Sequence, residues 1–213
     1  MELASMSFMS IKQAYLFNIR NVLNLGTTLV DEKGKEVLEL LNLITEIDFE
    51  RYPIDINQET VKGSIWNGTI LENYCKQLLD PDDKGFVYDY GNRLRGFDVD
   101  QIKYVIDKLK DSRVSRRAIA VTWRPNVDCC NDAVPCMILL DFKIRNKKLY
   151  IIGYWRSWDI YGASYANMRA IYNIGKHIST ILEVQLANLT IYASSAHIYY
   201  HDIKDAEKIL KEN

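Results

Sequence analysis

The hydrophobic positions of this chain follow a helical period in some segments and a strand period in others. Residues 11–25 repeat apolar positions at helical spacing and run into Gly26, which predicts a helix that ends there. Residues 98–112 are amphipathic and open on an aspartate cap, which predicts a second helix. Further helices are expected at residues 69–80, 165–184 and 203–213.

Strands are expected between these helices, at residues 117–123, 137–144, 148–155 and 188–201. The second and third of them flank the polar segment RNKK, which predicts an antiparallel hairpin. Residues 36–47 fit a long strand, with a helix as the alternative. The order predicts an α+β fold in which helices pack against one face of a mixed, partly antiparallel sheet. The whole chain, residues 1–213, is expected to form a single domain.

Composition excludes several classes of partner. The 27 basic and 28 acidic residues give a net charge of −1, so no broad attraction to nucleic acid or to an anionic membrane is expected. The N-terminal MELASMSFMS does not resemble a signal peptide, and no segment approaches a membrane span. The four cysteines include the vicinal pair Cys129 and Cys130, a poor disulfide framework, so a reducing cytoplasm is expected. Their spacing matches no zinc motif, and no metal is expected.

Cys136 follows Pro135 at the start of a predicted strand, directly after the polar loop RPNVDCCNDAV. One interpretation is a small hydrophobic residue of the core, the usual role of a cysteine on a strand. The other is a partly exposed nucleophile, since a nearby arginine would favour the reactive thiolate. Arg156 follows the partner strand of the hairpin, where antiparallel pairing would bring it back towards Cys136.

Arginines at two places could bind a phosphate. Arg116 and Arg117 stand directly before a predicted strand, either as a solvated basic cluster or as a phosphate clamp. The second interpretation rests on the guanidinium group, which pairs bidentately with phosphate oxygens. Arg156 and Ser157 offer a second donor set of this kind.

The segment YWRSWDIYGASYANM, residues 154–168, places Asp159 and Asn167 among aromatic and small residues. It is either an ordinary strand that turns into a helix, or the wall of a pocket that binds an anion and a small polar ring. His197 and Tyr199 lie two residues apart, on one face of a strand. They either stabilise the structure or hydrogen-bond a sugar hydroxyl.

Taken in chain order, these elements resemble those of thymidylate synthases. The matching elements are Tyr90-Gly91 with Arg95, Arg116-Arg117, Pro135-Cys136, Arg156-Ser157 with Asp159 and Asn167, and His197 with Tyr199. The resemblance runs from residue 85 to residue 201, and the whole chain is most similar to the short archaeal-type members. It implies a thymidylate synthase-like fold and the synthesis of dTMP by reductive methylation of dUMP.

The resemblance also implies roles for the matching residues. Cys136 would add to C6 of the uracil ring, Arg156 would bind the phosphate and favour the thiolate, and Tyr90 would assist removal of the C5 proton. The implied substrate-binding residues are Ser157 for the phosphate, Asp159 and Asn167 for the base, His197 and Tyr199 for the 3′-hydroxyl, and Arg116 and Arg117. The last two would reach the phosphate of the neighbouring subunit, because family active sites are shared across a homodimer.

Asn167 bears on the choice of base, because an amide offers an acceptor and a donor to the N3–H and O4 of uracil. An aspartate at this position would suit cytosine, as in related hydroxymethylases that act on cytidine nucleotides. The asparagine therefore favours dUMP. A pyrimidine-nucleotide hydroxymethylase and a nucleotide-binding protein without turnover remain the alternatives.

Other positions depart from the family pattern. Met137 and Trp155 replace the usual histidine and glutamine, and the N-terminal third matches poorly, which leaves Glu59 and Glu50 as candidates for the catalytic glutamate. The sequence given ends soon after the histidine–tyrosine motif, so the segment that closes over folate in longer members is not expected. The expected cofactor is a methylene-reduced pterin, either 5,10-methylenetetrahydrofolate or methylenetetrahydromethanopterin.

Overall fold

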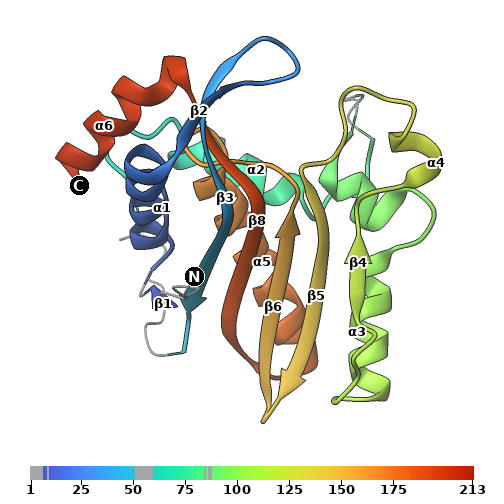
Figure 1. Cartoon of the computed structure of the whole chain (residues 1–213). Coiled ribbons are helices and arrows are strands. Elements are labelled where there is room, and N and C mark those ends of the chain that lie inside the picture. Colours follow the sequence, from blue (N-terminus) through green and yellow to red (C-terminus); the bar gives the residue numbers. More distant parts are fainter. Residues whose placement is uncertain (1–6, 9, 51–59, 84, 86–87) are drawn as a thin grey trace.

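The computed structural model describes residues 7–8, 10–50, 60–83, 85 and 88–213, and it is built around one mixed β-sheet (Figure 1). Its strands are β1 (Ser7–Phe8), β2 (Thr27–Val30), β3 (Glu36–Asp48), β4 (Ile119–Val121), β5 (Met137–Arg145), β6 (Lys148–Trp155), β7 (Trp158–Asp159) and β8 (Gln185–Tyr199). They lie in the order β1-β3-β8-β6-β5-β4, with β2 paired to β3 and β7 paired to β8. The β3–β8 and β5–β6 pairs are antiparallel, whereas β6 and β8 are parallel.

Helices connect these strands and cover one face of the sheet. They are α1 (Ile11–Leu25), α2 (Gly68–Gln77), the π-helix η1 (Asn92–Gly96), α3 (Gln101–Asp111), α4 (Pro125–Asp128), α5 (Ser164–Leu182), the 3-10 helix η2 (Tyr200–Asp202) and α6 (Ile203–Glu212). The helix α5 is buried along most of its length, crosses behind the sheet in Figure 1, and contacts α1, α2 and α3.

The core lies between α5 and the sheet face that it covers. Phe142, Ile151 and Leu189 on that face belong to the same buried cluster as Ile171 of α5. On the other face, strand side chains such as that of Ile152 stay partly exposed. This arrangement confirms the predicted mixed sheet with helices against one face.

Most of the predicted elements are present. The helix α1 occupies its predicted range, and Oγ of Ser10 caps it by accepting the N–H of Gln13 at 3.2 Å. The helix α3 begins directly after Asp100, whose carboxylate accepts the N–H of Lys103 at 2.9 Å. Residues 36–47 lie within β3, so the strand interpretation of this segment is correct and the helical alternative is wrong.

Several short elements are absent from the sequence-based prediction. The strands β1, β2 and β7 and the single turn α4 contain between two and four residues each. A periodic pattern needs a longer window than this, so their positions follow from pairing with distant segments and not from local sequence.

The strand pairings bring several chain segments to one edge of the sheet. Because β6 and β8 are parallel, their C-terminal ends meet at this edge. The antiparallel strand β5 begins there, with Met137 opposite Trp155. His197 near the end of β8 lies between Asp159 of β7 and Glu39 of β3. The predicted site residues on these strands are therefore neighbours in space.

Candidate active site

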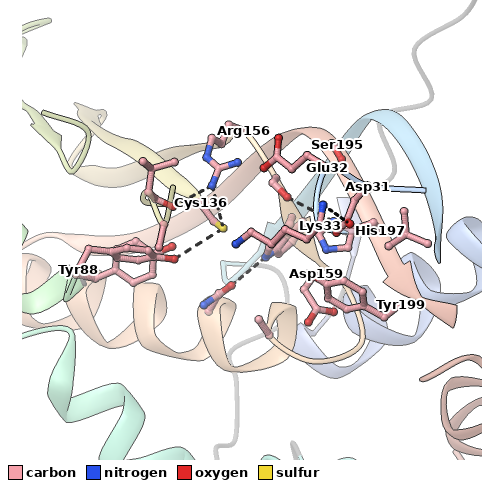
Figure 2. A pocket seen from close by; sticks show the side chains of 18 of the residues that line it. Asp31, Glu32, Lys33, Tyr88, Cys136, Arg156, Asp159, Ser195, His197 and Tyr199 are labelled. Carbon is pink, nitrogen blue, oxygen red and sulfur yellow. Dashed lines mark hydrogen bonds between the residues drawn. The ribbon is translucent and has the colours of Figure 1, made fainter. Parts of the chain in front are cut away.

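A pocket of about 800 Å³ opens at this edge of the sheet (Figure 2). Apart from the two candidates for the catalytic glutamate, every predicted site residue except Arg116 and Arg117 lines it, namely Tyr90, Cys136, Arg156, Ser157, Asp159, Asn167, His197 and Tyr199. These side chains come from the segment before η1, the start of β5, the ends of β6 and β8, the strand β7 and the helix α5. The volume is within the usual range for a small-molecule site.

Cys136 is half-buried, and Arg156 holds a guanidinium group beside its sulfur (Figure 2). The backbone N–H of Arg156 donates to the carbonyl of Cys136 at 2.9 Å, which extends the β5–β6 pairing. Its Nε donates to the carbonyl of Pro135 at 3.0 Å, and its Nη2 donates to that of Val134 at 2.9 Å. The same Nη2 lies 3.9 Å from Sγ of Cys136. A fixed positive charge next to the sulfur is the setting in which proteins use a cysteine as a nucleophile.

Two tyrosines before η1 border the cysteine. The hydroxyl of Tyr88 lies 3.8 Å from Sγ of Cys136, and the hydroxyl of Tyr90 accepts the backbone N–H of Met137 at 3.0 Å. Burial raises the pKa of Tyr88 to about 12 and raises the pKa of Tyr90 well above its ordinary value. Both hydroxyls therefore stay protonated at neutral pH, where they can donate hydrogen bonds but cannot act as bases.

A second polar group lies at the ends of β7 and β8. Oγ of Ser157 is 3.5 Å from Nδ1 of His197, whose ring packs edge-on against that of Tyr199. Burial lowers the pKa of His197, although the carboxylate of Asp159 opposes this shift. Burial also raises the pKa of Asp159, partly offset by the N–H of Gly162, which donates to its Oδ1 at 2.8 Å. His197 is thus mainly neutral at pH 7, with one ring nitrogen able to donate and the other able to accept.

Asn167 lies in the first turn of α5, and other side chains hold its amide at both ends. Its Oδ1 accepts the indole N–H of Trp158 at 3.1 Å, and its Nδ2 donates to the hydroxyl of Tyr74 at 2.6 Å. Burial raises the pKa of Tyr74 above its ordinary value, so this hydroxyl also stays protonated. Asn167 is buried but lines the pocket, which leaves part of its amide available to a ligand.

Arg116 and Arg117 lie outside this pocket. Both are exposed, in the turn between α3 and β4, which Figure 1 shows at the opposite end of the sheet from the start of β5. Ile119, two residues further on, pairs with Asp141 of β5. At about 3.3 Å per residue, Arg117 is roughly 20 Å from Cys136 along the strand direction. These arginines cannot reach the pocket of their own chain.

The pocket also contains charged residues that the sequence analysis does not single out. Lys33, in the turn between β2 and β3, joins Arg156 in the lining, and these are its two cations within the described part of the chain. The lining carboxylates among the described residues are Asp31, Glu32, Glu39, Asp89, Asp132 and Asp159. The segment DEKGKE around Lys33 is typical of an exposed hairpin turn, and its position over the pocket depends on the long-range pairing of β3 with β8.

Neither of the two candidates for the catalytic glutamate belongs to the described lining of the pocket. Glu50 follows β3 at the end remote from the pocket, and its side chain is ion-paired with Lys148. Glu59 lies outside the described residues. Among the residues that the structure describes, the glutamates that line the pocket are Glu32 and Glu39. Glu39 accepts a hydrogen bond from Oγ of Ser195 at 2.5 Å.

The described residues show neither a metal cluster nor a membrane-spanning helix. Among residues that the structure describes, no group of three or more His, Cys, Asp and Glu side chains could hold a metal ion. In the same part of the chain, no helix has the length and apolar character needed to cross a bilayer.

Comparison with known proteins connects this geometry to a family. The family model described as thymidylate synthase matches residues 56–213. A curated protein of Methanothermobacter marburgensis is 39% identical over 212 residues, which cover 94% of this chain and 95% of the relative. A protein of Methanothermobacter thermautotrophicus is 40% identical, with 91% and 92% covered, and one of Methanocaldococcus jannaschii is 31% identical, with 89% and 88% covered.

All three relatives carry the name "Putative thymidylate synthase". The matched residues include the strands β4 to β8, the helix α5 and the segment before η1. On this match, which spans well over half of its length, the chain belongs to the thymidylate synthase family.

Proposed function

We propose that this protein synthesises dTMP by reductive methylation of dUMP, through a covalent adduct between Sγ of Cys136 and C6 of the uracil ring. The observation that carries the proposal is the position of Nη2 of Arg156, 3.9 Å from Sγ of a half-buried cysteine that lines a pocket. Addition to an electron-poor ring needs an activated thiol with access to the ring, and a guanidinium group beside a pocket-lining sulfur supports both.

The phosphate of dUMP would bind at the cationic part of the pocket. Within the described part of the chain, Nη1 of Arg156 donates to no protein atom, so it can donate to a phosphate oxygen. Ser157 provides a hydroxyl next to it, and Lys33 brings a second positive charge from the β2–β3 turn. His197 and Tyr199 would then hold the 3′-hydroxyl of the sugar, for which the neutral imidazole can donate or accept.

The base would bind between Asn167 and Asp159. The amide of Asn167 can accept from N3–H and donate to O4 of uracil, and Asp159 is a second polar group of the same lining. Mismatched pairing with a buried amide costs about 1–3 kcal/mol for each unpaired group. This arrangement favours a uracil nucleotide over a cytosine nucleotide.

The proposed chemistry starts at the thiolate. Addition of Sγ to C6 breaks the C5–C6 double bond and makes C5 nucleophilic. C5 would then take the one-carbon unit, whose bond to its carrier breaks, and lose its proton. A hydride added to the transferred carbon would re-form the ring double bond and expel the thiolate. Because Tyr90 is itself protonated, it would orient a water molecule that takes the C5 proton.

A bound methylene-reduced pterin supplies the one-carbon unit and the hydride that reduces it to a methyl group. The pocket fits such a group, since its volume is in the upper part of the range for small-molecule sites. Leu29, Val37 and Leu78 give it an apolar wall, and the carboxylates of Glu32 and Asp132 could accept the N–H groups of a pterin ring. Both 5,10-methylenetetrahydrofolate and methylenetetrahydromethanopterin are candidates for this cofactor.

We propose further that the site is completed by a second copy of the chain in a homodimer. The described lining holds more carboxylates than cations, so additional positive charge would help to bind a phosphate dianion. Arg116 and Arg117 are exposed and cannot serve their own pocket. The sheet face that the helices leave open carries partly exposed apolar residues, among them Ile119, Val121 and Ile152, which suit a subunit interface.

Release of tritium from C5 of labelled nucleotides tests the proposed reaction. Wild-type protein and Cys136→Ala would be incubated with 5-tritiated dUMP or dCMP, with each of the two methylene-pterins in turn. We expect release from dUMP that depends on one of the donors and is lost in Cys136→Ala. The mass of the product then separates methyl transfer from hydroxymethyl transfer.

The same experiment identifies the alternatives. Release from dCMP, or a product carrying a hydroxymethyl group, would point to a pyrimidine-nucleotide hydroxymethylase. Binding of dUMP without any tritium release, under either donor, would point to a nucleotide-binding protein without turnover.

A further inference from the structure

The neighbouring side chain of Trp158 fixes the orientation of the Asn167 amide. The indole N–H of Trp158 can only donate a hydrogen bond, so the amide atom that faces it at 3.1 Å has to be the oxygen. The nitrogen then faces Tyr74, whose hydroxyl oxygen lies 2.6 Å away. Trp158 is 1% exposed and Asn167 is 6% exposed, so water cannot easily replace either contact.

These two contacts leave one hydrogen-bonding position on each end of the amide. Oδ1 has two acceptor positions and Nδ2 has two hydrogens, of which Trp158 and Tyr74 use one each. Towards the pocket, the amide therefore presents one acceptor on Oδ1 and one donor on Nδ2. This pattern matches N3–H and O4 of uracil. Cytosine has an acceptor at N3 and a donor at N4, and it would need the amide turned by half a rotation.

We infer that Trp158 is a specificity-determining residue, which selects uracil over cytosine by fixing the orientation of the Asn167 amide. The inference rests on the proposed function, since it concerns the same nucleotide site. A turned amide would place Nδ2 against the indole N–H, so that two donors would meet in a buried place. The selection therefore comes from a residue that positions Asn167.

Tyr74 does not contribute to this choice, although it holds the same amide. Its protonated hydroxyl can accept from Nδ2 in the observed orientation, or donate to Oδ1 in the turned one. Loss of the Tyr74 hydroxyl would remove a hydrogen bond that holds the Asn167 amide in either orientation, so it would weaken the binding of both bases alike. The two neighbours of one amide thus make different predictions, and this difference provides the test.

The test is the ratio of the dissociation constants for dCMP and dUMP, measured by calorimetry without a pterin. Trp158→Phe and Trp158→Met remove the donor and keep an apolar side chain, and two shapes increase the chance that one variant folds. Trp155→Phe is the matched control. Its indole packs 5.7 Å from that of Trp158 and is as deeply buried, but its N–H has no hydrogen-bond partner among the described residues.

We expect wild type, Trp155→Phe and Tyr74→Phe to prefer dUMP to a similar degree. We expect the preference for dUMP to fall by about tenfold to a hundredfold in Trp158→Phe or Trp158→Met. In these variants no buried N–H of residue 158 opposes the turned amide. A general distortion of the pocket would weaken the binding of both nucleotides equally and leave the ratio of their dissociation constants unchanged.

The outcomes separate this inference from the proposed function. If wild type binds neither nucleotide, the proposed function is wrong and the inference falls with it. If wild type prefers dUMP and the folded Trp158 variants keep that preference, only the inference is overturned. A loss of the preference for dUMP in Tyr74→Phe would also overturn the inference, because the orientation of the Asn167 amide would then depend on the tyrosine. This measurement does not require any Trp158 variant to fold.

Discussion

The hydroxyl oxygen of Tyr88 lies 3.8 Å from Sγ of Cys136, as close to the sulfur as the guanidinium of Arg156. Burial, which raises the pKa of Tyr88 to about 12, keeps this hydroxyl protonated. It can therefore donate a hydrogen bond to a thiolate, and its removal should leave the thiolate less stable.

We predict that Tyr88→Phe slows the alkylation of Cys136 by iodoacetamide at pH 7 by about threefold to tenfold. The reaction would be followed by peptide mass spectrometry in a Cys129→Ser and Cys130→Ser background, because both of those thiols are exposed. Tyr154→Phe is the matched control, since its hydroxyl contacts Ser194 and not the cysteine. Equal rates in the two tyrosine variants would show that Tyr88 has no influence on the thiolate.

A second prediction concerns a buried ion pair that connects the two sides of the pocket. Arg93 of η1 donates to both carboxylate oxygens of Asp128 in α4, at 2.8 and 3.1 Å, and both side chains are almost fully buried. The pair joins the segment of Tyr88 and Tyr90 to the loop before Cys136. Asp128→Asn would leave the guanidinium without its counter-charge and should lower the free energy of unfolding by about 3–5 kcal/mol.

Urea denaturation followed by circular dichroism measures this loss. The comparison is Asp107→Asn, which breaks the exposed ion pair between Lys103 and Asp107 and should change the unfolding midpoint very little. If the two variants unfold at the same urea concentration, the buried pair does not stabilise the fold in the way that its geometry indicates.

The position of the central site residues could be predicted from the sequence because it depends on short-range structure. A hairpin of two strands around RNKK returns the chain on itself, which places Arg156 next to Cys136 once the register is close to correct. His197 and Tyr199 share a strand face for the same local reason. For these residues, spacing and residue type were sufficient to predict which side chains lie next to one another.

Other parts of the site depend on packing between distant segments. Tyr74 reaches Asn167 only because α2 packs on α5, and Lys33 enters the pocket only because β3, which follows its turn, pairs with the distant strand β8. No periodicity in the sequence encodes such contacts. The sequence around Trp158 is typical of an ordinary buried aromatic residue. Its contact with the Asn167 amide depends on where the fold places the indole nitrogen.

A third prediction concerns pH. Burial lowers the pKa of His197 below its ordinary value of 6.5, against the opposing charges of Asp159, Glu39 and Asp31. Between the lowered pKa and about 6.5, the unfolded chain binds more protons than the folded one, so stability falls as the pH drops through this window. We expect His197→Gln to show a weaker loss of stability than wild type when the pH is lowered from 7.

Thermal unfolding of both proteins across this pH range measures the difference. His177→Gln serves as the control, since His177 is exposed on α5, and it should follow the wild-type curve. A His197→Gln curve parallel to that of wild type would show that the folded state does not resist protonation of His197.

The last prediction concerns the shared site. If Arg116 and Arg117 act on the phosphate held by a second copy of the chain, then each site needs Cys136 from one subunit and the two arginines from the other. Cys136→Ala and the double variant Arg116→Ala, Arg117→Ala should each be almost inactive alone. Their mixed dimer, however, contains one site in which all three residues are intact.

After unfolding and refolding an equal mixture, half of the dimers should be mixed, so we expect activity to return to about a quarter of the wild-type value. A mixture of Cys136→Ala with Arg156→Ala is the control, because both residues line the same pocket of one chain and no mixed dimer can restore it. Recovery in the first mixture and none in the control requires that the arginines act across the interface. Without recovery in the first mixture, the exposed pair is a solvated basic cluster, and the phosphate depends on Arg156, Ser157 and Lys33 alone.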